Sequence, residues 1–207
     1  MKYYRLREDV CFPGRWHLGD IRFVDNWLFR DPPQDFLEPG SNEVEVRVEG
    51  AELDFSLTVR YGVPVVSGRF IEALTGLHEI DEPHNFVVFN SLEILSERET
   101  EAQYFTMAIE SQADCVNESS SRFEKFEEND PIRPDLAGSY KAFTELAIYE
   151  DKCKGLHFFR LKKHLGAIIV SEEVKKKLEA KKITGVVFED LKTNSSAPSK
   201  HDQPTFN

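Results

Sequence analysis

The chain contains the stretch VVSGRFIEAL at residues 65–74 and a similar stretch, IVSEEVKKKL, at residues 169–178. In each stretch a serine follows two apolar residues, and apolar side chains return three and seven positions later. This spacing predicts a strand that leads into a helix with the serine at its N-cap, because such a serine accepts hydrogen bonds from amides that otherwise lack a partner. We therefore interpret Ser67 and Ser171 as structural caps and not as nucleophiles.

The segments around the first stretch have the pattern of β-strands. Residues 44–49 and 53–59 alternate apolar and polar side chains, which is typical of strands with one buried face. Short apolar runs predict three more strands, at residues 21–24, 86–89 and 104–109. The first helix should end near Gly76. The N-terminal part of the chain is therefore predicted to be a mainly antiparallel sheet.

The segments around the second stretch predict a β-α-β unit. Strands are expected at residues 147–149 and 156–161, followed by strand, capped helix and strand between residues 167 and 188. Residues 124–134 are polar and interrupted by prolines, so we expect a flexible connection there. The predicted fold class is α+β, with short capped helices and this β-α-β segment near the C-terminus.

We expect one domain over residues 1–191, either continuous or divided into two lobes of about 1–110 and 111–191. Residues 192–207 lose the apolar pattern and contain several serines and prolines. This composition predicts a disordered polar tail, because such a segment cannot bury enough apolar surface to offset its loss of conformational entropy.

Composition limits the class of protein. No window approaches the run of about 18 apolar residues that a membrane-spanning helix needs, and the N-terminus has no apolar signal region. The three cysteines are an odd number at wide spacings, which favours reduced thiols over a disulfide framework. We therefore expect a cytoplasmic protein that does not enter a membrane.

The formal net charge of −11 is unevenly distributed. Residues 1–140 hold 28 acidic and 13 basic side chains, whereas residues 141–207 hold 9 and 13. An acidic surface repels nucleic acid and anionic lipids and attracts a cationic partner. The simpler alternative is that these carboxylates only keep the protein soluble.

Motifs of common enzymes and cofactor sites are absent from the sequence, so we predict no catalytic residues and no cofactor. His78 and His84 flank three acidic residues, but Pro83 prevents a helix that would align them for a metal, and we predict no metal site. One alternative remains open. A small cytosolic enzyme or ligand-binding protein would use a pocket near Cys115 and His157, or near Trp16 and Trp27.

The order of several short motifs resembles a bacterial immunity-protein family that is encoded beside the toxin genes of polymorphic toxin systems. The resemblance spans roughly residues 1–190 and is carried by Tyr4-x-Leu6, Trp16-x-Leu18-Gly19, Leu53-Asp54-Phe55, Val63-Pro64-Val65-Val66-Ser67, Asp114-Cys115-Val116-Asn117-x-x-Ser120, Phe158-x-Arg160-Leu161, Ile169-Val170-Ser171 and Thr184-Gly185-Val186-Val187-Phe188. Many relatives have a tryptophan-containing segment after the Asp-Cys stretch. In this chain the corresponding segment is Phe123 to Phe126, which has no tryptophan and is followed by acidic residues. We therefore expect this region to differ with the partner.

The resemblance implies a non-catalytic inhibitor that binds a cognate toxin in the cytosol. Many antibacterial toxins are nucleases with basic clefts, which an acidic partner could fill by charge complementarity. We therefore expect a toxin with a basic surface, and two acidic clusters with two aromatic anchors as its binding site: Glu97, Glu99, Glu101, Phe123, Glu124, Phe126, Glu127, Glu128 and Asp130. The alternative is that both phenylalanines pack inward and the acids only face water.

Overall fold

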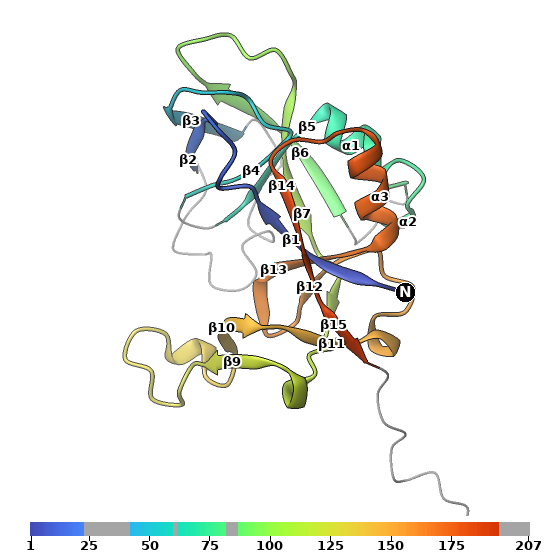
Figure 1. The fold of residues 1–207 in the computed structure, drawn as a ribbon. Helices are drawn as coiled ribbons and strands as arrows, with labels where there is room; N and C mark the ends of the chain where they lie inside the picture. Colours follow the sequence, from blue (N-terminus) through green and yellow to red (C-terminus); the bar gives the residue numbers. More distant parts are fainter. Residues whose placement is uncertain (23–41, 60–61, 82–86, 195–207) are drawn as a thin grey trace, which may run out of the picture.

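The computed structural model describes residues 1–22, 42–59, 62–81 and 87–194. In these residues the chain is strand-rich with short helices, which confirms the predicted α+β class. Figure 1 shows the six-stranded sheet in the upper half of the molecule and two small strand pairs at the lower end. Among the described residues, no helix is long and apolar enough to cross a membrane.

The larger sheet is built from the N-terminal half of the chain. Its spatial order is β2 (His17–Arg22), β3 (Asn42–Val48), β6 (Val87–Leu95), β7 (Tyr104–Ile109), β5 (Pro64–Ser67) and β4 (Phe55–Leu57). All neighbouring pairs are antiparallel except β3 and β6, which run parallel. The expectation of a mainly antiparallel N-terminal sheet therefore describes this arrangement, with one parallel pair.

The second sheet joins the two ends of the chain. Its order is β14 (Val186–Asp190), β1 (Tyr3–Glu8), β13 (His164–Ser171), β12 (Phe158–Leu161) and β8 (Gln112–Ala113). Strand β1 is antiparallel to both neighbours, so β13 and β14 run parallel with β1 between them. The strands predicted above do not include β1, because its partners lie more than 160 residues away and leave no local signal.

Two small strand pairs lie outside these sheets. In the antiparallel pair β9 (Arg122–Lys125) and β10 (Tyr140–Glu145), the last two residues of β9 overlap the connection predicted at residues 124–134. The parallel pair β11 (Ala147–Tyr149) and β15 (Lys192–Asn194) includes the first three residues of the predicted tail. Residues 192–194 of the predicted tail therefore form a strand, and residues 195–207 lie outside the described residues.

The helices are short. They are α1 (Gly68–Leu74), α2 (His78–Asp81) and α3 (Glu172–Ala180), with single 3-10 turns at η2 (Glu118–Ser120), η3 (Pro134–Leu136) and η4 (Glu150–Cys153). The side chain of Ser67 accepts a hydrogen bond from the amide of Phe70, and Ser171 accepts one from Val174, so both serines are N-caps. Helix α1 ends at Leu74, and Gly76 follows with a φ of +93°.

The main hydrophobic core lies between the two large sheets and is closed by α1 and α3. It contains Leu6 and Val170 from one sheet, Phe55 from the other, and Phe70 and Leu178 from the two helices. Alternate residues of each sheet supply two further clusters on the outer faces, centred on Phe159 and on Trp16. Because β1 and both helices enter the shared core, residues on either side of position 110 pack together.

Candidate interaction surface

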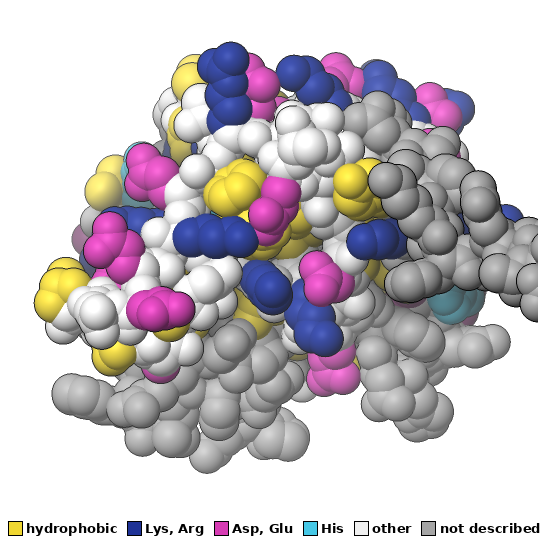
Figure 2. All heavy atoms as spheres, turned by 90° about the horizontal axis from the view of Figure 1, so that it is seen from below, with side chains coloured by type: hydrophobic (Ala, Val, Ile, Leu, Met, Phe, Trp, Pro, Cys, Tyr) yellow, Lys and Arg dark blue, Asp and Glu magenta, His cyan; other side chains and the backbone are white. Residues whose placement is uncertain are grey.

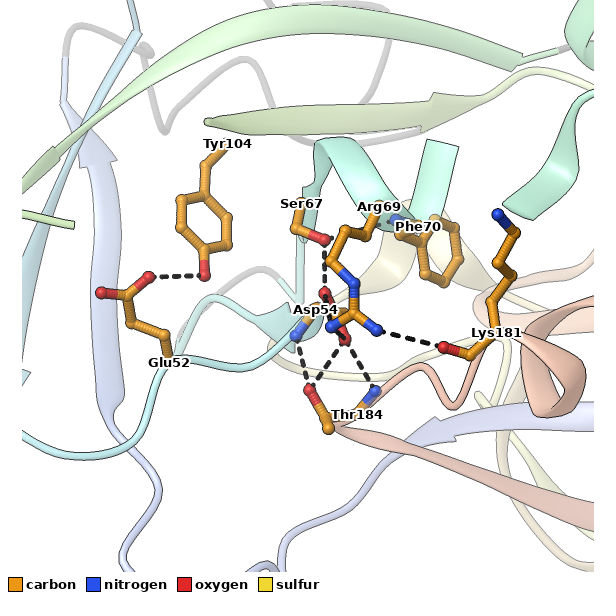
Figure 3. A network of polar contacts seen from close by, with 8 residues as sticks. All are labelled: Glu52, Asp54, Ser67, Arg69, Phe70, Tyr104, Lys181 and Thr184. Carbon is orange, nitrogen blue, oxygen red and sulfur yellow. Dashed lines mark hydrogen bonds and ion pairs between the residues drawn. The ribbon is translucent and has the colours of Figure 1, made fainter. Parts of the chain in front are cut away.

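A buried carboxylate joins three segments that are far apart in the sequence (Figure 3). Asp54 is 5% exposed, and its Oδ1 accepts a hydrogen bond of 2.7 Å from the Ser67 hydroxyl. Its Oδ2 accepts bonds from the Thr184 amide and hydroxyl, both 3.0 Å, and lies 3.1 Å from Nη1 of Arg69. We call Asp54, Ser67, Arg69 and Thr184 the polar junction.

The polar junction depends on a close backbone contact at Gly185. This residue has a φ of +83°, and a Cβ placed on it would lie 2.1 Å from the carbonyl oxygen of Phe55. Only glycine fits, because both the backbone conformation and the approach of the neighbouring strand exclude a side chain. The two motif segments Leu53-Asp54-Phe55 and Thr184-Gly185 therefore pack directly against each other.

Two other motif residues are also part of the framework. The indole of Trp16 is buried and donates a hydrogen bond of 2.8 Å to the Ser56 hydroxyl. Arg160 is buried in β12, where its guanidinium donates to the carbonyl of Leu165, and burial lowers its pKa to about 10. The motif positions described so far therefore hold the fold together.

The second cap lies beside the half-buried His157 and near a buried carboxylate, that of Glu79. The Ser171 hydroxyl is 2.9 Å from Nδ1 of His157, while the carboxylate of Glu79, fully buried, accepts a hydrogen bond from the His157 amide. The carboxylate of Glu173 lies 3.7 Å from the same Nδ1 atom that faces Ser171, whereas in a catalytic triad the acid and the nucleophile lie at different ring nitrogens. Ser171 itself is fully buried and caps α3, so this arrangement does not present a nucleophile to a substrate.

The cysteines do not form a site with His157. Cys115 is fully buried in the cluster around Phe159, together with Cys153. A hydrogen bond with Cys115 and burial raise the pKa of the Cys153 thiol, which opposes thiolate chemistry. Trp27 and His84 lie outside the described residues, and no group of three metal-ligating side chains occurs in the parts of the chain that are described.

The first acidic cluster lies in the turn between β6 and β7. Glu97, Glu99 and Glu101 are exposed. Two side chains outside the turn hold its backbone in place: Glu49 accepts a hydrogen bond from the Glu97 amide, and Glu52 accepts one from the Glu101 amide. Glu49 and Glu52 line an open hollow of about 340 Å³ together with Arg98, Glu99 and Glu101. Glu49 and Glu52, which the sequence analysis did not single out, therefore have structural roles here.

The second cluster belongs to the β9–β10 pair and the loop between its strands. Phe123 is half-buried, and its ring centroid lies 5.2 Å from that of Tyr140 and 6.1 Å from that of Phe143. Phe126 is also half-buried, with Nζ of Lys141 6.0 Å from its ring centroid. Both phenylalanines thus pack at least partly against the protein.

The acidic residues of this second cluster differ in their contacts. Glu124, Glu127 and Glu128 are exposed, and none of them makes an ion pair within the described residues. Asp130 instead accepts hydrogen bonds from the amides of Ile132 and Arg133, and these bonds hold the pKa of its carboxyl below the ordinary value. Three of the four acids therefore remain available to a partner, and Asp130 shapes the loop.

The structure does not bring the two acidic clusters together. Figure 1 shows the β6–β7 turn at the top of the molecule and the β9–β10 pair at the bottom. A typical interface buries about 800 Å² on each partner. One compact interface would therefore include one cluster and leave the other exposed. Sequence spacing could not show this separation, because strands β7 and β8 carry the chain from one end of the molecule to the other.

These features define a strand-rich α+β protein. The sequence motifs named above build its framework, and its acidic loops lie on the surface. The model of the Immunity protein family (Imm11) matches residues 20–193, and the chain belongs to this family. The match confirms the resemblance drawn from the order of the motifs. No curated protein sequence matches the chain.

Proposed function

We propose that the chain is a non-catalytic immunity protein that binds a cognate antibacterial toxin in the cytosol and blocks its activity. The observation that carries this proposal is the family match over residues 20–193. It is supported by the positions of Ser67, Ser171 and Cys115, which are buried and engaged in the framework. The description of the family supports toxin immunity, and we propose that this chain provides it by binding rather than by turnover.

The charge of the chain supports a toxin with a basic surface, such as a nuclease. The net charge is −11, and the exposed carboxylates of both clusters would attract a cationic surface and speed its association. A carboxylate-rich surface in the active cleft of a nuclease would also exclude its polyanionic substrate. This mechanism needs neither a cofactor nor binding to nucleic acid or to a membrane.

Of the two acidic clusters, we assign toxin binding to the β9–β10 pair. The β6–β7 turn is held by Glu49 and Glu52, and its residues 96–103 include no large hydrophobic side chain. The β9–β10 pair and its loop combine exposed carboxylates, which make no ion pair with any residue that the structure describes, with an exposed apolar residue, Ile132. Interfaces usually need both features, because apolar anchors supply affinity while charges at the rim mainly raise the association rate.

The first test is protection. Cells that express the protein encoded next to this chain's gene should stop growing, and co-expression of the chain should restore growth. The two purified proteins should form a complex, and the activity of the neighbour should fall in proportion to the chain added. If the neighbour is toxic and the chain neither binds it nor protects, the proposed function is wrong.

The second test compares two variants with the same change in net charge. One variant carries Glu124→Lys, Glu127→Lys and Glu128→Lys, and the other carries Glu97→Lys, Glu99→Lys and Glu101→Lys. All six side chains are exposed, so both variants should fold. We expect the first variant to bind the toxin at least tenfold more weakly with a reduced dependence on salt, and the second to change little. If only the second variant binds weakly, the toxin-binding site lies at the β6–β7 turn and our assignment is wrong.

A further inference from the structure

The loop between β9 and β10 exposes one large apolar side chain. Ile132 is 82% exposed, more than any other large hydrophobic residue in the described ranges. Pro131 and Pro134 are exposed as well, so three of the four residues at positions 131–134 are apolar and exposed, and Arg133 is the fourth. Single exposed apolar residues are common on protein surfaces, but a group of three at the end of a loop indicates a contact surface.

The same loop is held rigid by hydrogen bonds. Oδ1 of Asp130 accepts bonds from the amides of Ile132, at 2.9 Å, and Arg133, at 2.8 Å. The guanidinium of Arg133 is 2.8 Å from the Asp135 carboxylate, at the start of η3. At the base of the loop, Phe126 exchanges backbone hydrogen bonds of 3.0 Å with Ser139 and Gly138. Residues 126–139, which we call the knob, therefore present Ile132 in a fixed position.

The knob is joined to the body through an aromatic base. The ring of Tyr140 lies 4.8 Å from that of Phe143, and its hydroxyl donates a 2.7 Å hydrogen bond to Glu118. The backbone of Tyr140 also contacts two residues where β12 meets β13. Its amide donates a hydrogen bond to the carbonyl of Lys163, and its carbonyl oxygen is 2.9 Å from Nδ1 of His164. A rigid, anchored loop loses little conformational entropy when it binds, which favours affinity.

Carboxylates flank the apolar tip. Glu127 and Glu128 belong to the knob itself and Glu124 to the strand that enters it, and all three are exposed. Figure 2 views the molecule from this end and shows hydrophobic side chains lying among acidic ones at its left edge, where the loop projects. On the rest of that face, acidic and basic side chains are interspersed.

We infer that the knob is an anchor that inserts Ile132 into an apolar socket on the toxin, and that lysine or arginine side chains line the rim of this socket. This inference rests on the proposed function and specifies how its partner is recognised. The apolar tip should determine how slowly the complex dissociates, whereas the three glutamates should mainly determine how fast it forms. We assign an apolar socket with a basic rim to the partner because the knob has an apolar centre with acidic side chains on its flanks.

The test measures binding of Ile132 variants to the toxic neighbour described above. We expect Ile132→Ala to raise Kd about tenfold and Ile132→Asp about a hundredfold, mostly through faster dissociation. The matched control is Val48→Asp in β3, at the opposite end of the molecule, where the valine is 55% exposed. This control should change Kd less than about twofold. Thermal melting of each variant separates lost binding from lost folding.

The outcomes distinguish the two proposals. If the unmodified chain protects cells and Ile132→Asp binds as tightly as Val48→Asp, the anchor is wrong and the immunity function stands. If the unmodified chain fails to bind, the function itself is wrong. If Ile132→Asp unfolds, Ile132→Ala and Ile132→Ser decide the question, because a small side chain at an exposed loop position should leave the fold intact. Unchanged dissociation rates for both of these variants would also overturn the anchor.

Discussion

The polar junction and the knob use the same chemistry in opposite ways. In the junction, the buried carboxylate of Asp54 organises donors from two other segments, at residues 67–69 and at Thr184, and the contact is closed by Gly185. In the knob, the partly exposed carboxylate of Asp130 organises only the amides that follow it, and the loop carries the exposed Ile132. The comparison indicates that changes in the junction should mainly destabilise the fold, whereas changes in the knob should mainly alter what the fold binds.

The largest effect is expected at Gly185. Gly185→Ala would place a Cβ 2.1 Å from the Phe55 carbonyl oxygen, at a φ of +83°, so we expect a loss of about 4 kcal/mol in the free energy of unfolding or no folded protein. Gly138→Ala in the knob is the matched control, since its φ is +75° but no atom lies within 4 Å of the new Cβ. That control should lose only about 1–2 kcal/mol. Equal losses in urea unfolding would contradict the role of the close contact.

The next effect is expected at Asp54. Asp54→Ala would leave the Ser67 hydroxyl and the Thr184 amide without their acceptor, and we expect a loss of about 3 kcal/mol in the free energy of unfolding. Asp130→Ala should cost less, because the amides that it releases can bond to water. Binding of the toxin should show the reverse order once both variants are folded. A larger loss of stability for Asp130→Ala would break the comparison.

A smaller effect is expected at the helix caps. Ser67→Ala and Ser171→Ala should each lose about 0.5–2 kcal/mol in the free energy of unfolding. The loss at Ser67 should be the larger one, because its hydroxyl also donates to Asp54, whereas that of Ser171 lies beside the ring of His157. In a double-mutant cycle, Ser67→Ala should couple to Asp54→Ala and Ser171→Ala should not. Protection against the toxin should persist in each variant that stays folded.

The smallest effect is a local response to acid in the knob. Two backbone amides hold the pKa of Asp130 below its ordinary value of 3.8, so the ordered loop is favoured above that value and loses this contribution as the pH falls through the lowered pKa. The amide chemical shifts of Ile132 and Arg133 should titrate together with a midpoint below 3.8. Asp130→Asn should remove this titration. A midpoint above the ordinary value would show that the hydrogen bonds do not form in solution.

Local patterns predicted much of the secondary structure. The strands around residues 44–49 and 104–109 and the helix that follows Ser171 were predictable because alternation, helical spacing and capping each act within a few residues. Strand β1 and β15 were not predictable, since each is stabilised by pairing with segments more than 40 residues away. The polar composition of residues 124–134 also concealed an ordered knob, because Asp130 and the prolines fix a loop without a periodic pattern.

The candidate site shows the same division. The sequence identified the acidic residues and the aromatic pair, because these can be recognised by type alone. It could not show that Phe123 packs on Tyr140, that Asp130 bonds to its own loop, or that Glu97 lies far from Glu124. Ile132 was not singled out at all, since one isoleucine between prolines has no periodicity to indicate exposure.

The sequence by itself determined the α+β class and both capped helices, because capping and alternation are properties of neighbouring residues. It also indicated membership of an immunity-protein family, because the order of motifs along a chain does not depend on how the chain packs. Only the tertiary structure decided that β1 lies between β13 and β14, that Asp54 joins Ser67 to Thr184, and that one acidic cluster lies beside an exposed isoleucine. The physical reason is that burial, strand pairing and hydrogen bonding between distant segments depend on how the whole chain packs.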